Sequence, residues 1–357
     1  MLKWKTNLKP AMWLPDLDVL EIETDASMVE ISIAVSTSAG GPPVKVILSG
    51  EYTGASGRVT LYDIGRLVRP YLIAVTHCVC VRLTVTAGNN DPLNSILTAV
   101  GLNGLAPGDC SEYLESRFTT SVDEKLTAPG RTEYASFTLL PGSAGGRLTV
   151  TDDYLSAVGS LSRRSRTLRT YPPNTGAFDV YTYTEDVSPD QFADPSAGVL
   201  LGYTVSMGRR LLRFNIPERP LPATVEFRFV NRFGFVETAG FTGPKTDTYD
   251  VERRFVTIGG RRKSYSREET FSSASATGFW PDSMIPLATA LAVSDSVTAI
   301  ENGIETEVDV TDSDIKPDDS GLNSVSVTWR PVRSGAPIVP ASARSRSFDP
   351  TFDNTFN

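Results

Sequence analysis

Apolar and polar residues alternate along most of the chain with the two-residue period of β-strands. The segment 29–35 reads VEISIAV, and the segment 44–48, VKVIL, repeats the alternation after a Gly-Gly-Pro-Pro turn. The same pattern predicts further strands over residues 20–24, 58–62, 77–86, 199–207, 210–216, 249–258, 262–271, 304–310 and 323–329.

Helical spacing of apolar residues is confined to short segments. Residues 64–71 have this spacing for a turn or two, and Pro70 limits the helix that they can form. Residues 282–292 predict the one helix of useful length, and Pro286 favours a start inside that window. We therefore predict an all-β fold, with tandem β-sandwich-like domains, short capping helices and extended termini.

Changes in composition divide the 357 residues into four parts. We expect an N-terminal β-sandwich over residues 1–90, a second β domain over 91–215 and a C-terminal β domain over 216–334. The second domain contains residues 162–198, which are rich in Ser, Arg, Pro and Asp and predict an exposed loop insertion. Residues 335–357 predict an extended C-terminal tail.

The tail carries a near-repeat, Phe-Asp-Pro-Thr followed by Phe-Asp-Asn-Thr. Phe348, Phe352 and Phe356 lie among polar residues and cannot form a core by themselves. We expect other molecules to order them, so these three residues are candidate interface residues.

A candidate internal repeat links two segments about ninety residues apart. GGRLTVTDDYLSAVGSL, residues 145–161, parallels SGRVTLYDIGRLVRPYL in its Gly-Arg opening, its alternating strand and the short apolar-periodic segment that follows. Two similar sandwich units in tandem would explain this parallel.

The most aromatic part of the chain is an expected hairpin. Residues 225–229 place three apolar side chains on one strand face, and Asn231 and Gly234 occupy the first and last positions favoured in a type I turn. The aromatic face is expected to be core. A second interpretation is that Phe233 and Phe235, at the tip, dock into a partner subunit.

Charged residues are unevenly distributed in a chain whose formal net charge is −8. This net charge disfavours nucleic acid as a partner. Two basic clusters and an acidic segment, residues 301–319, suit head-to-tail contacts between copies or with neighbouring proteins, and solvated loops are the alternative. The basic clusters are Arg163, Arg164, Arg166 and Arg169, then Arg253, Arg254, Arg261, Arg262 and Lys263.

The residues that usually carry chemistry are few. Three cysteines, Cys78, Cys80 and Cys110, have no disulfide-framework spacing, which favours a reducing compartment. His77 is the one histidine, and we expect the cysteines beside it to be small buried hydrophobes rather than a redox or metal site.

No catalytic or cofactor motif emerges from the sequence. It lacks a Gly-x-Ser-x-Gly elbow and a phosphate-binding loop, and its four tryptophans are scattered, although a carboxylate pair that hydrolyses glycosidic bonds leaves no fixed spacing. Asp309, Asp312 and Asp314 lack the glycine and the glutamate of a calcium loop. We expect no enzyme activity, cofactor or bound metal.

The sequence also shows no signal for export or membrane insertion. The N-terminus lacks a continuous apolar stretch, and the most apolar later window, residues 284–293, is about half of the length that spans a bilayer.

Three motifs resemble β-rich structural proteins encoded by phages and prophages of Bacteroidetes. They are GRVTLYDIGRLVRPYL near residue 60, FRFVNRFGFVETAGFTG in the middle of the chain, and SVTWRP close to its end. The resemblance implies a virion component of the tail or its tip, with no catalytic residues to carry over. The Arg-rich segment 162–176 and the Phe-Asp tail have no counterpart in it.

We therefore predict a non-enzymatic virion protein, most consistent with a phage tail or baseplate component, made in the host cytoplasm and assembled in several copies. Its expected partners are copies of itself and other tail proteins, and its candidate contact residues are Phe233, Phe235, Arg163, Arg164, Arg166, Arg261, Arg262 and the three tail phenylalanines. The alternatives are a carbohydrate-binding or host-recognition module and, third, a glycan-degrading enzyme.

Overall fold

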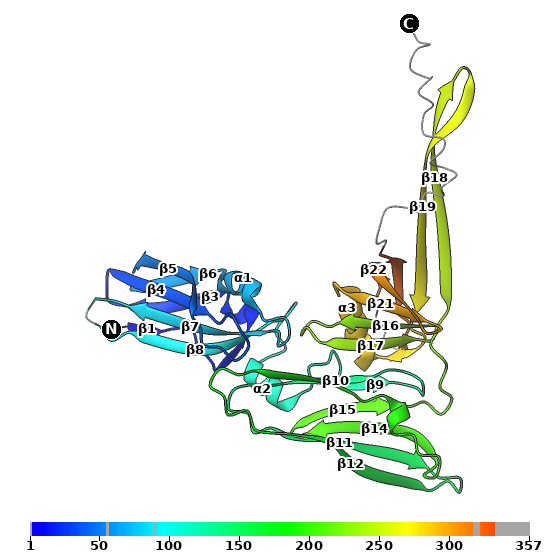
Figure 1. Ribbon diagram of the computed structural model, residues 1–357, viewed down its shortest axis with the longest axis horizontal. Coiled ribbons are helices and arrows are strands. Elements are labelled where there is room, and N and C mark those ends of the chain that lie inside the picture. Colours follow the sequence, from blue (N-terminus) through cyan, green and yellow to red (C-terminus); the bar gives the residue numbers. More distant parts are fainter. Residues whose placement is uncertain (1, 55–56, 89, 317–321, 333–357) are drawn as a thin grey trace.

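The computed structural model describes residues 2–54, 57–88, 90–316 and 322–332. Over these residues the fold is all-β with a few short helices, which confirms the predicted fold class. Figure 1 shows three lobes and a long hairpin, β18 (Lys245–Ile258) and β19 (Arg261–Ala276), that projects from the third lobe. Within the described residues, no helix has the length and apolar character needed to cross a membrane.

The N-terminal domain is a sandwich of two sheets, with strand orders β1-β3-β6 and β2-β8-β7-β4-β5. Alternate residues of both sheets, such as Leu20 and Ile33, fill one shared core. Its strands are β1 (Leu2–Trp4), β2 (Ala11–Trp13), β3 (Val19–Thr24), β4 (Met28–Val35), β5 (Lys45–Thr53), β6 (Arg58–Tyr62), β7 (Cys78–Thr86) and β8 (Leu93–Val100).

Short helices cap this sandwich. The predicted helical segment 64–71 is confirmed as α1 (Ile64–Val68) followed by the 3-10 turn η2 (Arg69–Tyr71), and η1 (Leu14–Leu17) packs beside α1. Strand β8 pairs with β7 along its whole length, so the domain continues past the boundary expected at residue 90.

The second domain places the two-stranded sheet β10-β13 over a five-stranded sheet of order β12-β11-β14-β15-β9. Its aromatic core includes Phe137, Tyr203 and Phe214. Its elements are α2 (Cys110–Ser116), β9 (Glu124–Leu126), β10 (Tyr134–Leu139), β11 (Gly146–Leu155), β12 (Leu161–Tyr171), β13 (Tyr181–Asp186), η3 (Pro189–Gln191), β14 (Val199–Met207) and β15 (Arg210–Asn215).

The prediction of a loop insertion over residues 162–198 was wrong, because β12, β13 and η3 lie in it. β12 has no apolar alternation, and its pairing with β11 places Arg163 and Arg164 opposite Asp153 and Asp152. Residues after β11 make a tight turn directly into β12.

The third domain is a seven-stranded sheet of order β17-β16-β21-β22-β24-β19-β18, with α3 (Ile285–Ala292) packed against its core face. Pro286 lies in the first turn of α3, as predicted. The other elements are β16 (Val225–Val230), β17 (Val236–Phe241), β20 (Trp280–Pro281), η4 (Asp282–Met284), β21 (Val297–Glu301), β22 (Ile304–Asp314), β23 (Leu322–Asn323) and β24 (Ser326–Pro331).

The predicted aromatic hairpin is confirmed as β16 and β17. The backbone N–H of Gly234 donates to the carbonyl of Asn231 at 2.9 Å, which closes the predicted turn. Phe227 and Phe229 are buried in the core of the third domain, so the strand's aromatic face is core.

A separate apolar core joins the three domains. It takes side chains from the ends of β2 and β8, from α2 and the second domain, and from the β16–β17 turn. The buried members are Ala11, Trp13, Cys78, Val100, Leu102, Cys110, Leu114, Leu140, Val180, Phe233 and Phe235. We call this set the junction core.

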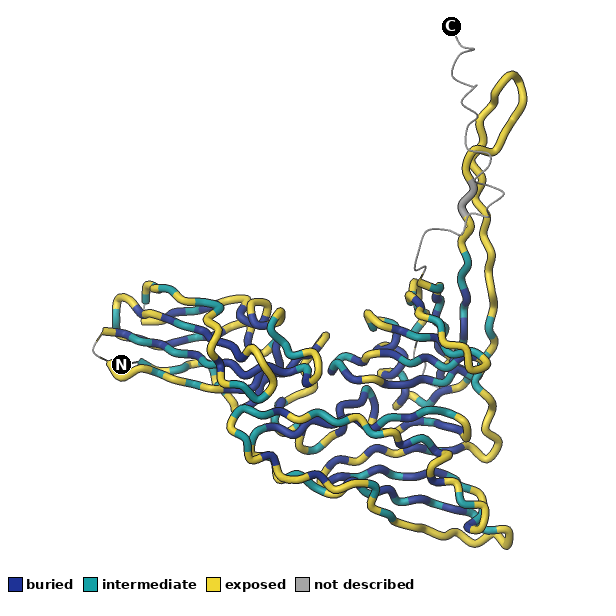
Figure 2. The backbone as a smooth tube through the Cα atoms, in the orientation of Figure 1, coloured by how far each residue is buried: buried dark blue, intermediate teal, exposed yellow. Residues whose placement is uncertain are grey.

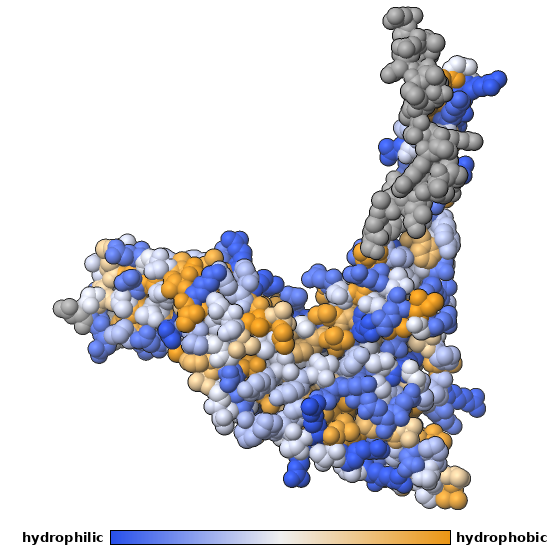
Figure 3. All heavy atoms as spheres, in the orientation of Figure 1, coloured by the Kyte–Doolittle hydropathy of each residue, from blue (hydrophilic) through white to orange (hydrophobic). Residues whose placement is uncertain are grey.

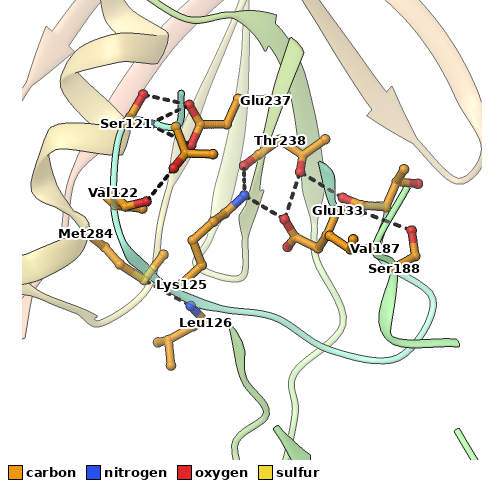
Figure 4. A network of polar contacts seen from close by, with 12 residues as sticks. Ser121, Val122, Lys125, Leu126, Glu133, Val187, Ser188, Glu237, Thr238 and Met284 are labelled. Atoms are coloured by element: carbon orange, nitrogen blue, oxygen red, sulfur yellow. Dashed lines mark hydrogen bonds and ion pairs between the residues drawn. The ribbon is translucent and has the colours of Figure 1, made fainter. Parts of the chain in front are cut away.

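Buried polar contacts fasten the second domain to the third, as Figure 4 shows. The Nζ of Lys125 in β9 donates to a carboxylate oxygen of Glu133 at 2.6 Å and to the carbonyl of Thr238 in β17 at 2.8 Å. The neighbouring Glu237 accepts hydrogen bonds from the backbone N–H and the hydroxyl of Ser121. Buried charged groups have lost their hydration, so they need these hydrogen-bond partners. The contacts therefore favour a single arrangement of the second and third domains.

Candidate functional site

The β18–β19 hairpin extends beyond the sheet from which it starts. β19 pairs with β24 only from Ser273 to Ala276, so the more distal residues of the hairpin pair only with each other. Gly259 and Gly260 form the turn with φ of 58° and 75°, the left-handed values of a type I′ hairpin turn. At about 3.3 Å per residue, the part of β18 from Thr248 onward is about 35 Å long. We call this part of the hairpin, residues 248–272, the arm.

The arm has no core of its own. Figure 2 shows it exposed along nearly its full length, in contrast to the buried strands of the three domains. Its apolar side chains are exposed as well, at 76% for Tyr249, 44% for Phe255 and 53% for Ile258. A lone two-stranded hairpin is only marginally stable in water, so an arm with this composition is typical of a segment that another molecule covers.

The end of the arm is basic. Arg253 and Arg254 in β18 and Arg261, Arg262 and Lys263 in β19 all lie in the distal part of the hairpin, and we call these five residues the basic tip. The guanidinium of Arg262 lies over the ring of Phe255, 4.0 Å from its centroid. Figure 3 shows mainly hydrophilic side chains on the visible end of the arm.

The sheet at the base of the arm has an acidic outer face. Val308 of β22 points into the core. The residues on either side of it lie on the other face of the strand, where every second residue points to solvent. A bulge between Val310 and Asp312 keeps the later acids on that same face, because Ser313 then lies opposite the buried Val327. We call the resulting row the acidic face, which consists of Glu305, Glu307, Asp309, Asp312 and Asp314.

Only part of the acidic face is neutralised by nearby cations. Arg228 pairs with Glu305, and Lys316 pairs with Asp314 at 2.8 Å. Across the described ranges, no cation pairs with Glu307, Asp309 or Asp312. Arg330 of β24 lies opposite Asp309 in the sheet without forming a salt bridge to it, so these three carboxylates are the part of the row that no ion pair within the described residues neutralises.

A cleft of about 540 Å³ lies at the fork where β19 leaves β24. Phe271 lines it on the arm side, and Asp309, Arg330 and Pro331 line it on the sheet side. The cleft therefore offers an aromatic wall, with the carboxylate of Asp309 and the guanidinium of Arg330 on the opposite side.

The arginines of β12 have a different setting. Arg163 pairs with Asp153 at 2.7 Å, Arg164 pairs with Asp194, and Arg166 pairs with the fully buried Asp152. Each of these candidate interface residues thus has an acidic partner in its own domain. The acids of β11 were not singled out in the sequence, although they precede the Arg-rich segment by about ten residues.

The interpretation that Phe233 and Phe235 dock into a partner subunit was wrong. They are 1% and 9% exposed and belong to the junction core. The ring of Phe233 stacks on Tyr113, with centroids 5.3 Å apart, and lies 5.8 Å from Trp13. The docking surface for this turn is therefore supplied by the other domains of the same chain.

The cysteines are buried, as predicted. Burial raises the pKa of Cys78 to about 12 and that of Cys80 to about 11, so both thiols stay protonated near neutral pH. Burial also lowers the pKa of His77. Among the residues that the structure describes, no three His, Cys, Asp or Glu side chains are grouped to hold a metal ion.

The sequence also singled out three aspartates and three phenylalanines of the tail. Asp309, Asp312 and Asp314, compared above with a calcium loop, lie on a strand instead of a loop. Phe348, Phe352 and Phe356 lie outside the described residues.

Sequence reasoning missed the arm as a unit. Two strands were predicted at 249–258 and 262–271, and both are confirmed, but their separation from the sheet was not foreseen. One available signal was the presence of apolar residues at both odd and even positions of 249–258 among charged neighbours, which fits neither a buried face nor a solvated one.

Comparisons with known proteins assign no family. No family model matches the chain, and no curated protein matches it. Among solved structures, a Ca2+-stabilized adhesin that helps an Antarctic bacterium reach out and bind ice is 10% identical, over 91% of this chain and 90% of that chain, with a TM-score of 0.14. A TM-score this low carries no argument about the fold or the function of this protein.

Proposed function

We propose that the protein is a non-enzymatic structural component of a phage tail or baseplate, assembled in several copies within the virion. The observation that carries the proposal is the arm, a hairpin of about 35 Å that exposes apolar and basic side chains. Such a segment costs stability in an isolated monomer and contributes binding free energy once a neighbour covers it.

The domain junctions support a role as a rigid building block. The junction core packs the three domains against one another, and the hydrogen bonds of Lys125 to Thr238 and of Ser121 to Glu237 join the second domain to the third. A building block needs this rigidity. The motif resemblance to phage structural proteins points to the same class.

Particle composition tests the proposal. Phage particles from a strain that carries the gene are purified on a density gradient, and their proteins are quantified by mass spectrometry. We expect several copies of the chain per particle. Recovery of the protein only outside the particles would show that the proposal is wrong.

A matched variant tests the role of the arm. Replacing residues 249–271 by a two-glycine turn joins Thr248 to Ser272, which already lie opposite each other, and leaves the domain cores intact. We expect the purified variant to fold but to be absent from particles. Normal incorporation of the variant would remove the arm as the basis of assembly.

A further inference from the structure

We propose that the basic tip of one copy binds the acidic face of β22 in a second copy, so that copies join head to tail. This inference rests on the proposed assembly in several copies, and it names both the partner and the contact. The occupant of the acidic face is the arm of a neighbouring chain.

The two surfaces have complementary charge. Residues 252–263 hold five cations and one carboxylate, whereas β22 holds five carboxylates and no cation. Arg253, Arg261 and Lys263 have no ion pair within the described part of the chain, as is also true of Glu307, Asp309 and Asp312. Each surface therefore has free charge for the other to neutralise.

The contact cannot form within one chain. The acidic face lies at the base of the arm, and the basic tip lies at the far end, about 35 Å away along the strand. Figure 1 shows the arm directed away from the third domain, so the tip does not fold back on β22. A second copy is needed to bring the two surfaces together.

Apolar groups fit the same arrangement. Phe255 and Ile258 are exposed near the basic tip, and the fork cleft beside Asp309 has the ring of Phe271 as one wall. An aromatic or aliphatic anchor flanked by arginines matches a cleft that pairs an aromatic wall with a carboxylate. Phe255, already stacked under Arg262, is the side chain that we assign to the cleft.

The geometry also determines the kind of assembly. The tip and the acidic face are different surfaces, so each copy has one of each to offer, and the contact is heterologous. Repetition of a heterologous contact gives a ring if the rotation closes and a filament if it does not.

Charge reversal tests the contact in the full chain. Sedimentation velocity measures self-association of the wild type, of a tip variant (R253E/R261E/K263E) and of a face variant (E307K/D309K/D312K). We expect each variant alone to weaken association by about a hundredfold, because like charges then face each other. A mixture of the two variants should associate again, since both contacts regain opposite charges.

A matched control separates this contact from an effect of net charge. R66E/R147E/R219E changes the net charge by the same amount and in the same direction as the tip variant, at exposed positions on the domains, and we expect it to associate as the wild type does. Circular dichroism and thermal melts establish that every variant is folded.

Three results would overturn the inference. The first is a wild type that stays monomeric up to its solubility limit. The second is a tip variant that associates as the wild type does. The third is an association that is lost when residues 335–357 are removed but kept when the charges of the tip are reversed. Each leaves the virion proposal to be decided by particle composition. Conversely, the protein could be absent from phage particles while a mixture of the tip and face variants still associates. This result would contradict the virion proposal and support the contact.

Discussion

The imidazole ring of His77 lies against the α-carbon of Gly234, so closely that a Cβ on this glycine would be 2.5 Å from the ring Cγ. On its other side the ring meets Gly101, where a Cβ would be 2.3 Å from Nε2. His77 immediately precedes β7, and Gly234 ends the β16–β17 turn. Two glycines thus leave the space in which the N-terminal and third domains approach each other.

The first prediction concerns this close approach. Gly101 does not have a positive φ, so Gly101→Ala acts through the clash alone and should lower the free energy of unfolding by about 1–3 kcal/mol, as overpacking does. Urea unfolding measures the change. His77→Ala in the same chain should restore much of the loss. Gly50→Ala is the control, because the nearest atom to its Cβ is 3.6 Å away. Equal stability of Gly101→Ala and wild type would contradict the packing described.

A pH dependence follows from the same residue. Burial, with a smaller contribution from Arg69, lowers the pKa of His77 in the folded state. Below the unfolded pKa of about 6.5, the unfolded chain therefore binds a proton that the folded chain does not, and stability falls as the pH drops through this range. Above this pKa the imidazole is neutral in both the folded and the unfolded chain, so it causes no loss of stability.

Urea unfolding at pH values on either side of about 6.5 measures this effect. The chain has one histidine, and His77→Asn removes it while suiting the φ of 51° at this position. We expect the wild type to lose more stability than the variant on acidification between these values. Parallel losses in the two proteins would assign the dependence to other groups.

The Phe233 side chain should be a main contributor to the junction core. Phe233→Ala removes a buried ring that contacts Tyr113 and Trp13, and large-to-small changes of this type cost about 3–5 kcal/mol. Differential scanning calorimetry measures the change. Phe279→Ala, at a position that is 75% exposed, is the matched control and should leave the melting temperature nearly unchanged. Similar melting temperatures for the two variants would place Phe233 outside the core.

The buried Lys125–Glu133 ion pair, which lies in the second domain beside Thr238 of the third, should show strong coupling. Lys125→Met alone leaves Glu133 buried without its cation and should cost about 3–5 kcal/mol. The double variant with Glu133→Leu should recover most of this loss, because no unpaired charge remains. Chemical denaturation of the two single variants and the double variant gives the coupling energy.

Lys5→Met provides the comparison for that cycle. Its ion pair with Glu21 is partly exposed, and Arg58 also pairs with Glu21, so its removal should change stability little. Additive effects of the changes at Lys125 and Glu133 would show that the two side chains do not interact as described.

The sequence predicted the local elements well where a short-range signal exists. Alternation located β6 and β14, Asn231 and Gly234 located the β16–β17 turn, and Pro286 located the first turn of α3. In each case the cause lies within a few residues, because strand alternation, turn geometry and the fixed φ of proline are local properties.

The same reasoning failed at β12. Its outward-facing edge position removes the apolar alternation, and the stabilising acids belong to β11 and to the loop between η3 and β14. Serine, arginine and proline in this segment are typical of a loop when read alone.

By itself, the sequence determined that the chain is a series of strands with few helices, and where most of the strands lie. Only the tertiary structure decided that the turn at Phe233 is buried by other domains, that β18 and β19 leave their sheet as an arm, and that five carboxylates align on one face of β22. The physical reason is that backbone conformation follows from neighbouring residues, whereas burial and the meeting of charges depend on which distant strands pair and where that pairing ends.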